Sequence, residues 1–287
     1  MGRLALAAKV THVPSMLFCE RPGPFQGRRD EAVAGHREIG RRMRELGVDT
    51  IVVLDTHWLV NTGFHLNAMD RFHGVFSSNE FPHLIGDLPF DVPGNPELGD
   101  AIARCATANG VTLLSHHIAS LDLEYGTLVP LRYMDPDNVL RVVSVAAWCP
   151  WHEYTDSRVV GESIRQAIEQ SESTVALIAS GSLSHRIHDN RDAAAGLFTI
   201  SGEFYRQVDL RVLELWEQGR FAEFVAMLPD YARACHGEGL MHDTAMLLGA
   251  LGWDRYECRV EILTPWFPSS GTGQVNAVFP VAALVSA

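Results

Sequence analysis

Lysine is almost absent from this sequence: Lys9 is the only one among 287 residues, and 23 basic side chains face 35 acidic ones. The resulting formal charge of −12 would repel the phosphates of nucleic acids and anionic lipid headgroups. No apolar run reaches the ~18 residues that a membrane-spanning helix requires, and the first residues lack the pattern of a signal peptide. We therefore expect no nucleic-acid partner, no membrane association and a cytoplasmic location.

Cysteine pairs are also missing. The five cysteines form an odd set without a Cys-x-x-Cys motif, which argues against a disulfide framework and against a structural zinc site. Internal repeats, low-complexity tracts and obvious linkers are absent as well. Because 47% of the residues are apolar, a chain of this length can bury a substantial core. We expect one domain that spans residues 1–287.

Apolar and amphipathic segments alternate along the first two thirds of the chain. Four runs rich in β-branched residues are typical of buried strands: 4–10, 50–55, 140–147 and 174–179. Helical periodicity lies between them, at 30–46, 96–109 and 158–170. This alternation predicts an α/β fold with a largely covered central sheet and helices on its faces.

The other segments are less regular. Residues 59–95 predict a long connection with short strands of its own that lies over one end of the sheet. Three further helices are expected: 203–218, 220–227 with a break at Pro229, and 240–250. Strand character returns over 257–284. Within that tail, the glycines of SSGTGQ (269–274) indicate a plain turn rather than a phosphate loop, because no lysine and no helix signal follow them.

Histidines follow three of the strand-like runs. His12 comes after the first run, His57 after the second, and His185 after the fourth, with His152 as a further candidate. In open α/β sheets the ligand site lies outside the carboxyl ends of the strands, so these side chains are expected to meet in one crevice. One such histidine is more often a hydrogen-bonding residue than a ligand. Three together favour a site.

Two imidazoles and one carboxylate form a facial set that suits non-haem Fe(II) and leaves positions open for a bidentate substrate and dioxygen. The best carboxylate is Glu238 in CHGEGLMHDT (235–244), where the flanking glycines allow a close backbone approach. Taken alone, Glu238 would more often be a solvated turn residue. His236 and His242 beside it are rival ligands.

Four motifs, THVPSM, DTHW, SGSLSH and GEGLMHDT, occur in an order and spacing that resemble the class III extradiol ring-cleavage dioxygenases over almost the whole chain. That family has the α/β fold of protocatechuate 4,5-dioxygenase catalytic subunits. The stretches LEYGTLVPLRYM (123–134) and FPSSGTGQVNAVFP (267–280) are most similar to members that act on 3,4-dihydroxyphenylacetate. The resemblance implies cleavage of a catechol by O₂ beside its hydroxyls, giving a 2-hydroxymuconic semialdehyde.

The resemblance also assigns roles to residues. It implies that His12, His57 and Glu238 bind Fe(II), with Mn(II) and Mg(II) as alternatives, and that His185 is an acid/base group beside the metal. Several relatives have a second acid/base histidine where this chain has Tyr125. A phenol with a pKa near 10 is a poor proton shuttle, so either Tyr125 orients the substrate or His116 takes that role. His117 is expected at the surface.

The carboxylate of 3,4-dihydroxyphenylacetate needs a cationic partner if it is buried. Since lysine is so scarce, we expect an arginine or histidine, with Arg186, His188 and Arg132 as candidates. A homo-oligomer is expected. Two other functions stay open: a metal- or Ser/His-dependent hydrolase, for which GSLSH lacks the G-x-S-x-G elbow, and a non-catalytic binding protein on the same fold.

Overall fold

The structure is a computed structural model that describes residues 1–188 and 196–281. Its centre is a sheet of eight strands: β1 (Arg3–Val10), β2 (Thr50–Leu59), β3 (Phe64–Asn67), β6 (Leu113–His116), β7 (Arg141–Trp148), β8 (Thr174–Ser180), β9 (Glu261–Ser269) and β10 (Thr272–Phe279). Their order across the sheet is β6-β3-β7-β2-β8-β1-β10-β9. A separate antiparallel pair is formed by β4 (Arg71–Phe76) and β5 (Leu88–Pro93).

The helices surround this sheet. They are α1 (Ser15–Phe18), α2 (Asp30–Glu45), α3 (Pro96–Ala108), α4 (Tyr125–Met134), α5 (Tyr154–Gln170), α7 (Glu203–Glu217), α8 (Phe221–Ala234) and α9 (His242–Leu251), with short 3₁₀ turns η2 (Glu238–Met241) and η3 (Trp253–Arg255). Among the described residues, no helix has both the length and the apolar character to cross a bilayer.

Four neighbouring strands in the middle of the sheet, β7, β2, β8 and β1, run parallel. In register, Val53 of β2 lies between Ser144 of β7 and Ile178 of β8. These strands are apolar along nearly their whole length because both of their faces are covered. Their carboxyl ends therefore open at one edge of the sheet, where ligand sites of such folds lie.

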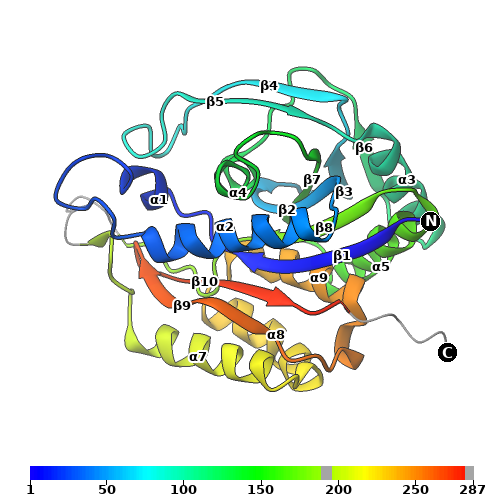
Figure 1. Cartoon of the computed structure of the whole chain (residues 1–287). Helices are drawn as coiled ribbons and strands as arrows, with labels where there is room; N and C mark the ends of the chain where they lie inside the picture. The colour runs from blue at the N-terminus through cyan, green and yellow to red at the C-terminus, as the bar shows by residue number, and fades with distance from the viewer. Residues whose placement is uncertain (189–195, 282–287) are drawn as a thin grey trace.

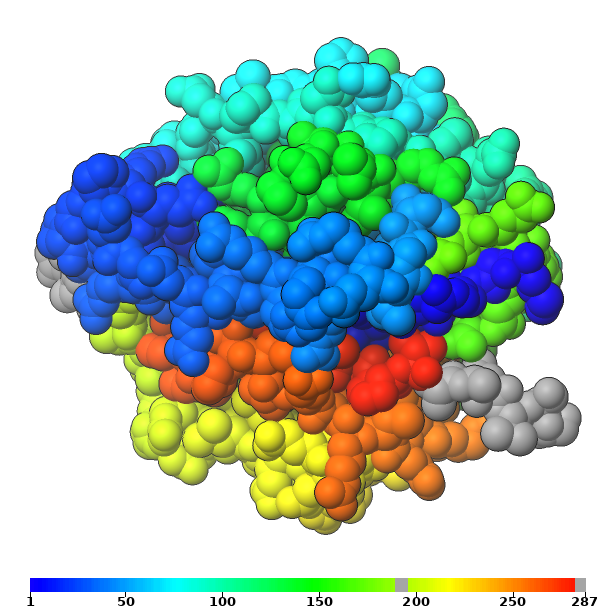
Figure 2. Space-filling model, viewed as in Figure 1, coloured from blue at the N-terminus to red at the C-terminus, as the bar shows by residue number. Residues whose placement is uncertain are grey.

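Two apolar cores lie on the two faces of the sheet. One contains side chains of α3, α5, α7, α8 and α9, and the other contains side chains of α1, α2, α4 and the β4–β5 pair. Figure 1 shows α2 and α4 on one side and α7, α8 and α9 on the other. In the space-filling view, α2 lies at the front of the molecule, and the cyan β4–β5 region forms the top of the molecule (Figure 2). The predicted α/β class with a covered central sheet is confirmed.

The buried face of β1 holds the one lysine of the chain. Lys9 has 0% of its surface exposed and forms an ion pair with Asp243 in α9, which is also buried. The pair links the sheet to the helix that follows Glu238. Burying two charges together costs desolvation energy, but removing either partner would leave an uncompensated charge and cost more.

Two elements differ from the sequence prediction. The predicted helix break at Pro229 is wrong, because α8 continues through this residue to Ala234. Its neighbours Phe224, Leu228 and Tyr231 are buried, and this packing outweighs the ~3 kcal/mol that an internal proline costs a helix. Strand β2 extends past the predicted run to Leu59 and includes His57, although its regular pairing with β7 shifts after Asp55.

The predicted turn in SSGTGQ is confirmed. Ser270 and Gly271 form a two-residue connection between β9 and β10, with Ser269 opposite Thr272. Both residues have positive φ angles, 50° and 94°, as the favoured two-residue hairpin turns require. Of the predicted strand region at 257–284, residues 282–284 lie outside the described residues.

Candidate metal centre

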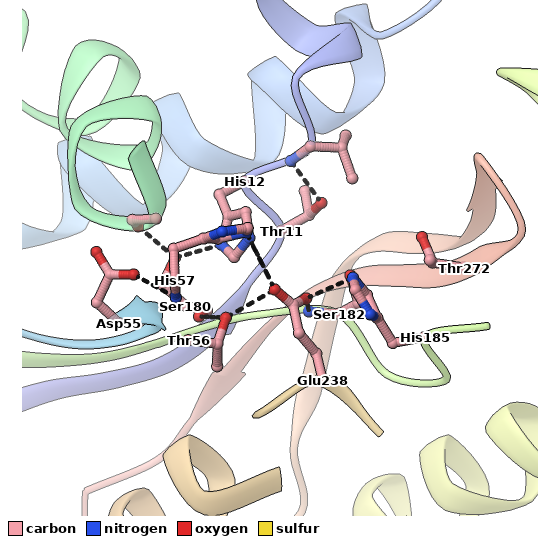
Figure 3. A network of polar contacts seen from close by, with 12 residues as sticks. Thr11, His12, Asp55, Thr56, His57, Ser180, Ser182, His185, Glu238 and Thr272 are labelled. Carbon is pink, nitrogen blue, oxygen red and sulfur yellow. Dashed lines mark hydrogen bonds and ion pairs between the residues drawn. The ribbon is translucent and has the colours of Figure 1, made fainter. Parts of the chain in front are cut away.

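Two histidines and one glutamate meet at the carboxyl ends of the parallel strands. His12 lies just after β1, His57 in the last part of β2, and Glu238 in η2 (Figure 3). Glu238 Oε1 is 3.1 Å from His12 Nε2 and 3.4 Å from His57 Nε2. Their candidate ligand atoms all lie within 4.8 Å of one another, so this group could hold a metal ion. The structure thus brings together the three residues that the sequence singled out.

A serine at the end of β8 determines which nitrogen of His12 carries the proton. Ser180 Oγ donates its one proton to the carbonyl oxygen of Gly126 at 2.5 Å, and it lies 2.9 Å from His12 Nδ1. The hydroxyl can therefore only accept from Nδ1–H. In neutral His12 the bare nitrogen is then Nε2, the atom that faces Glu238.

Glu238 is a buried anion that is 3% exposed. Burial alone would raise the pKa of its carboxyl, but positive charge on the His12 and His185 imidazoles and hydrogen bonds from His12 and His57 would hold that pKa well below the usual range. When these imidazoles are neutral, that compensation is missing and a bound cation has to supply it. Thr56 Oγ1 lies 2.8 Å from Oε1, and the backbone N–H of Ser182 donates to Oε2. Within the described residues, no lysine or arginine pairs with this carboxylate.

These observations test whether a cation fits. The bare Nε2 of neutral His12 and a carboxylate oxygen would face each other with lone pairs only, and a buried carboxylate requires a compensating positive charge. A divalent metal ion satisfies both requirements, and imidazole and carboxylate are suitable donors for Fe(II). The donor set fits the ion that the motifs imply.

The backbone around Glu238 has an unusual conformation. His236, Gly239, Leu240 and Met241 all have φ between 52° and 63°, a region that residues other than glycine enter at a cost. A Cβ at Gly239 would lie 2.9 Å from the carbonyl oxygen of Ala147, so the main chain passes close to β7 here. The turn that contains Glu238 is therefore strained, and the surrounding packing holds it in this conformation.

His185 lies on the other side of the glutamate. Its Nε2 is 3.8 Å from Glu238 Oε2, and its side chain is 27% exposed. Burial lowers the pKa of His185, and the neighbouring Glu238 carboxylate opposes this shift only in part. A neutral imidazole at this position can accept a proton from a ligand in the cavity.

Tyr125, the first residue of α4, packs against the same cluster. Its ring centroid is 3.8 Å from that of His57 and 5.4 Å from that of His12. Burial raises the pKa of Tyr125 above its usual value, so the phenol stays protonated. It can donate a hydrogen bond, but it does not exchange its proton readily.

A cavity of about 170 Å³ opens at this cluster. Apolar side chains from several segments line it together with the polar residues: Val13, Pro14, Phe81, Leu84, Trp148, Ile187 and Leu197. A cavity of ~150 Å³ accommodates benzene in another protein, so this space suits a ligand with one aromatic ring. Ser15, Ser269 and Thr272 add hydroxyl groups to the wall.

The structure does not bring the other predicted residues to this cavity. His116 Nε2 pairs with His65 Nδ1 at 2.7 Å, and the two rings are nearly parallel, with an angle of 6° between them. Arg132 is exposed and pairs with Glu20 at 2.8 Å in a separate surface groove. None of these groups is among the residues that line the cavity.

The two other candidates for binding a substrate carboxylate also point elsewhere. Arg186 is exposed, with Nη1 3.5 Å from His236 Nε2. His188 Nε2 lies 3.1 Å from Thr199 Oγ1. Neither lines the cavity.

The remaining histidines have other environments. His242 Nδ1 lies 2.7 Å from Ser157 Oγ, and burial lowers the pKa of this histidine to about 3. His152 packs on Phe64 with a ring distance of 4.4 Å. His117 is exposed beside Asp100 at 2.8 Å, at the surface as expected.

Sequence reasoning missed several residues that act through others. Ser180 orients His12, and Asp209 in α7 anchors the segment of His185 by accepting hydrogen bonds from the N–H and hydroxyl of Ser184. Their signals are weak: a serine that ends an apolar strand, and one aspartate on a helix whose neighbours are buried. Arg29, a buried cation near the cavity, was also missed.

Known proteins resemble the chain over most of its length. A family described as the catalytic LigB subunit of aromatic ring-opening dioxygenase matches residues 6–280. The 3,4-dihydroxyphenylacetate 2,3-dioxygenase of Escherichia coli is 55% identical over 265 residues, which cover 92% of this chain and 96% of that protein. The 2-aminophenol 1,6-dioxygenase beta subunit of a Pseudomonas species is 24% identical over 243 residues, covering 79% and 78% of the two chains.

A solved structure supports the fold independently. An uncharacterized protein of Escherichia coli K12 superposes with a TM-score of 0.65 and 15% identity, covering 96% of this chain and all of that one. At this identity the likeness concerns the fold alone. The family match and the 55% identical relative go further. This chain belongs to the family of catalytic LigB subunits of aromatic ring-opening dioxygenases, the class III extradiol enzymes.

Proposed function

We propose that this enzyme cleaves the ring of 3,4-dihydroxyphenylacetate with O₂, beside the two hydroxyls, at Fe(II) held by His12, His57 and Glu238. The observation that carries the proposal is the meeting of these three side chains at a cavity sized for one aromatic ring. The substrate is supported by the relative that is 55% identical over 92% of the chain. The product would be a 2-hydroxymuconic semialdehyde.

When bound, Fe(II) supplies Lewis acidity and the redox chemistry with dioxygen that a protein side chain lacks. The residues around it hold and move protons. Ser180 keeps the proton of His12 on Nδ1, so that Nε2 remains a ligand. Thr56 and the backbone N–H of Ser182 orient the Glu238 carboxylate.

His185 is the acid/base group in this proposal. Its lowered pKa leaves Nε2 free to accept a phenolic proton from the substrate and to return it when the ring opens. Tyr125 holds its own proton and orients the ring by donating a hydrogen bond. His116 has no part in this arrangement, because it lies outside the cavity wall.

The hydrolase alternative finds little support. Ser184 Oγ donates to Asp209 at 2.7 Å, and among the described residues no histidine is hydrogen-bonded to it as a base. Asp55 accepts from the backbone N–H of His57 and from Thr127, so it does not orient an imidazole nitrogen. A non-catalytic binding protein would have no need of two imidazoles, a buried carboxylate and an acid/base histidine in one cavity.

The test is anaerobic metal analysis followed by oxygen uptake. We expect one Fe(II) per chain and one O₂ consumed per 3,4-dihydroxyphenylacetate, with a yellow product. Loading with Mn(II) or Mg(II) in parallel identifies the active metal. Iron-loaded protein that consumes no oxygen with any catechol would overturn the proposal.

We further propose that the enzyme works in the cytoplasm, which its likeness to an enzyme of Escherichia coli supports. The homo-oligomer stays a prediction. Cell fractionation and light scattering on the purified protein test both statements, and a monomeric mass would contradict the second.

A further inference from the structure

Arg29, the residue just before α2, is a buried cation that pairs with no carboxylate among the residues that the structure describes. It is 5% exposed. Its Nε donates to Ser15 Oγ at 2.9 Å, and its Nη2 donates to the carbonyl oxygens of Leu197 and Pro268 at 3.0 and 3.1 Å. The guanidinium also lies over the ring of Phe267 at 4.8 Å. Within residues 1–188 and 196–281, no carboxylate forms a salt bridge with it.

A charged arginine in this position is costly. Burial lowers the pKa of Arg29 to about 10, so the side chain remains protonated at neutral pH. Buried charges in proteins are nearly always paired, because neutral carbonyl and hydroxyl acceptors compensate only part of the lost hydration. The missing partner is therefore an anion that the described chain does not supply.

The groups that Arg29 holds form part of the cavity wall. Ser15 and Leu197 both line the cavity, and so does Ser269, whose Oγ is 3.3 Å from Ser15 Oγ. Because Ser15 Oγ already accepts from Arg29, its own proton is available to Ser269 or to a ligand in the cavity. Two hydroxyls backed by one buried positive charge are suited to an anion that enters with the aromatic ring.

We propose that Ser15 and Ser269, polarised by Arg29, form a subsite that binds the side-chain carboxylate of the substrate. This inference rests on the proposed function. Arg29 determines specificity through Ser15 and through its charge, whereas the ring and its hydroxyls bind at the metal centre. Arg29 does not line the cavity itself, but it holds Ser15 and Leu197, which do. The side chains of the exposed Arg132 and Arg186 pair with Glu20 and His236, which do not line it, so these two arginines take no part.

The first experiment compares kcat and KM for 3,4-dihydroxyphenylacetate and for 4-methylcatechol, which lacks the carboxylate. We expect Arg29→Met to lower the preference for the acid by about 10–100-fold through KM, the range for loss of a charge-assisted contact. Arg28→Met is the matched control. Arg28 is the adjacent residue and lies over the ring of Phe198 at 4.1 Å, but it is exposed and has no bond to Ser15. Its variant should keep the wild-type preference.

A structural role for Arg29 would lower kcat/KM for both substrates equally, and that result would overturn the proposal. Arg29→Lys keeps the charge and should recover part of the preference. If Arg29→Met does not fold, Ser15→Ala combined with Ser269→Ala leaves the arginine in place and decides the question. An unchanged preference in that double variant would also exclude the subsite.

A binding measurement separates this inference from the proposed function. Calorimetry on metal-free protein compares 4-hydroxyphenylacetate with 4-methylphenol, and no turnover is required. We expect tighter binding of the anion in the wild type and loss of that difference in Arg29→Met. A wild-type protein that opens catechols but binds both phenols equally would refute the subsite while leaving ring cleavage intact.

Discussion

At the scale of single residues, the candidate centre depends on where a few protons lie. Ser180 gives its proton to the carbonyl oxygen of Gly126, so it can only accept from His12, and Nε2 of that imidazole is left bare. Partners that orient a metal-binding histidine in this way typically change metal affinity by 10–100-fold when they are removed. The hydroxyl of Ser180 is therefore as much a part of the centre as the ligands.

We expect Ser180→Ala to weaken Fe(II) binding by about 10–100-fold, because His12 then loses the group that fixes its tautomer. Competition with a chelating dye measures the affinity. Ser144→Ala is the control, since Ser144 is also buried on a central strand but contacts Thr127 instead of a candidate ligand. Equal affinities of the two variants would mean that His12 needs no such orientation.

Replacing His12, His57 or Glu238 by alanine should abolish stoichiometric metal binding and leave the fold largely intact. Residues at strand ends and turns contribute little core packing. Iron content and circular dichroism of the purified variants test the two parts of this prediction. His236→Ala is the control because His236 is exposed two residues before Glu238. A Glu238→Ala protein that retained one Fe(II) per chain would rule out the assignment.

At the scale of elements, the segment after β8 is fixed to α7 by one aspartate. Asp209 accepts hydrogen bonds from Ser184, Tyr231 and Trp266 at 2.7–3.2 Å. All of these groups are donors, and together they anchor the residue before His185. The position of the proposed acid/base imidazole, His185, thus depends on a helix outside the cavity.

Asp209→Asn places an amide N–H₂ among these donors, so at least one buried bond is lost. We expect the free energy of unfolding to fall by about 1–3 kcal/mol and kcat to fall while iron content is retained. Urea denaturation and single-turnover kinetics measure the two effects. Wild-type kcat in a destabilised variant would show that His185 is positioned without this anchor.

Much of the element pattern was predictable because it depends on burial along the chain. The apolar runs of β1, β7 and β8 and the amphipathic face of α2 are local signals of a covered sheet. The continuation of α8 past Pro229 was not predictable, because the packing that stabilises the helix there comes from residues that are distant in sequence.

For the site, the strand-end rule and the motifs singled out His12, His57, Glu238 and His185 before their geometry was known. Arg186 and His188 were candidates for binding the carboxylate because they are close to His185 in sequence, and Arg132 was a third candidate in VPLRYM. Arg186 follows His185 directly, yet its side chain is exposed. Arg29 is 156 positions away from His185 and reaches the cavity wall through the hairpin of β9 and β10 and through Ser15. A contact between residues so far apart cannot be predicted from a single sequence.

At the scale of the whole molecule, buried histidines should make the fold sensitive to acid. Burial lowers the pKa of His36 to about 4 and that of His242 to about 3. In the unfolded chain both titrate near 6.5. The unfolded state therefore binds protons first as the pH falls, so the stability is fully present above about pH 6.5 and is lost toward pH 4 for His36 and toward pH 3 for His242.

In metal-free protein, each of these histidines should contribute a slope of up to about 1.4 kcal/mol per pH unit between pH 6 and 4.5. Urea denaturation at several pH values measures the slope. His36→Gln should remove the contribution of one histidine to this slope, whereas His117→Gln, at an exposed position, should leave the slope unchanged. A flat profile in the wild type would mean that both histidines are protonated in the native state.

The burial of Lys9 against Asp243 has a practical consequence. An amine-reactive reagent meets no accessible lysine on the native surface, so apart from the terminal amino group the folded protein offers no site for acylation. A fluorophore or a solid support can then be attached at one defined point, the terminal amino group, while Lys9 keeps its ion pair with Asp243. A second label appears only when β1 separates from α9, so mass spectrometry of the doubly labelled fraction would follow the opening of the core itself.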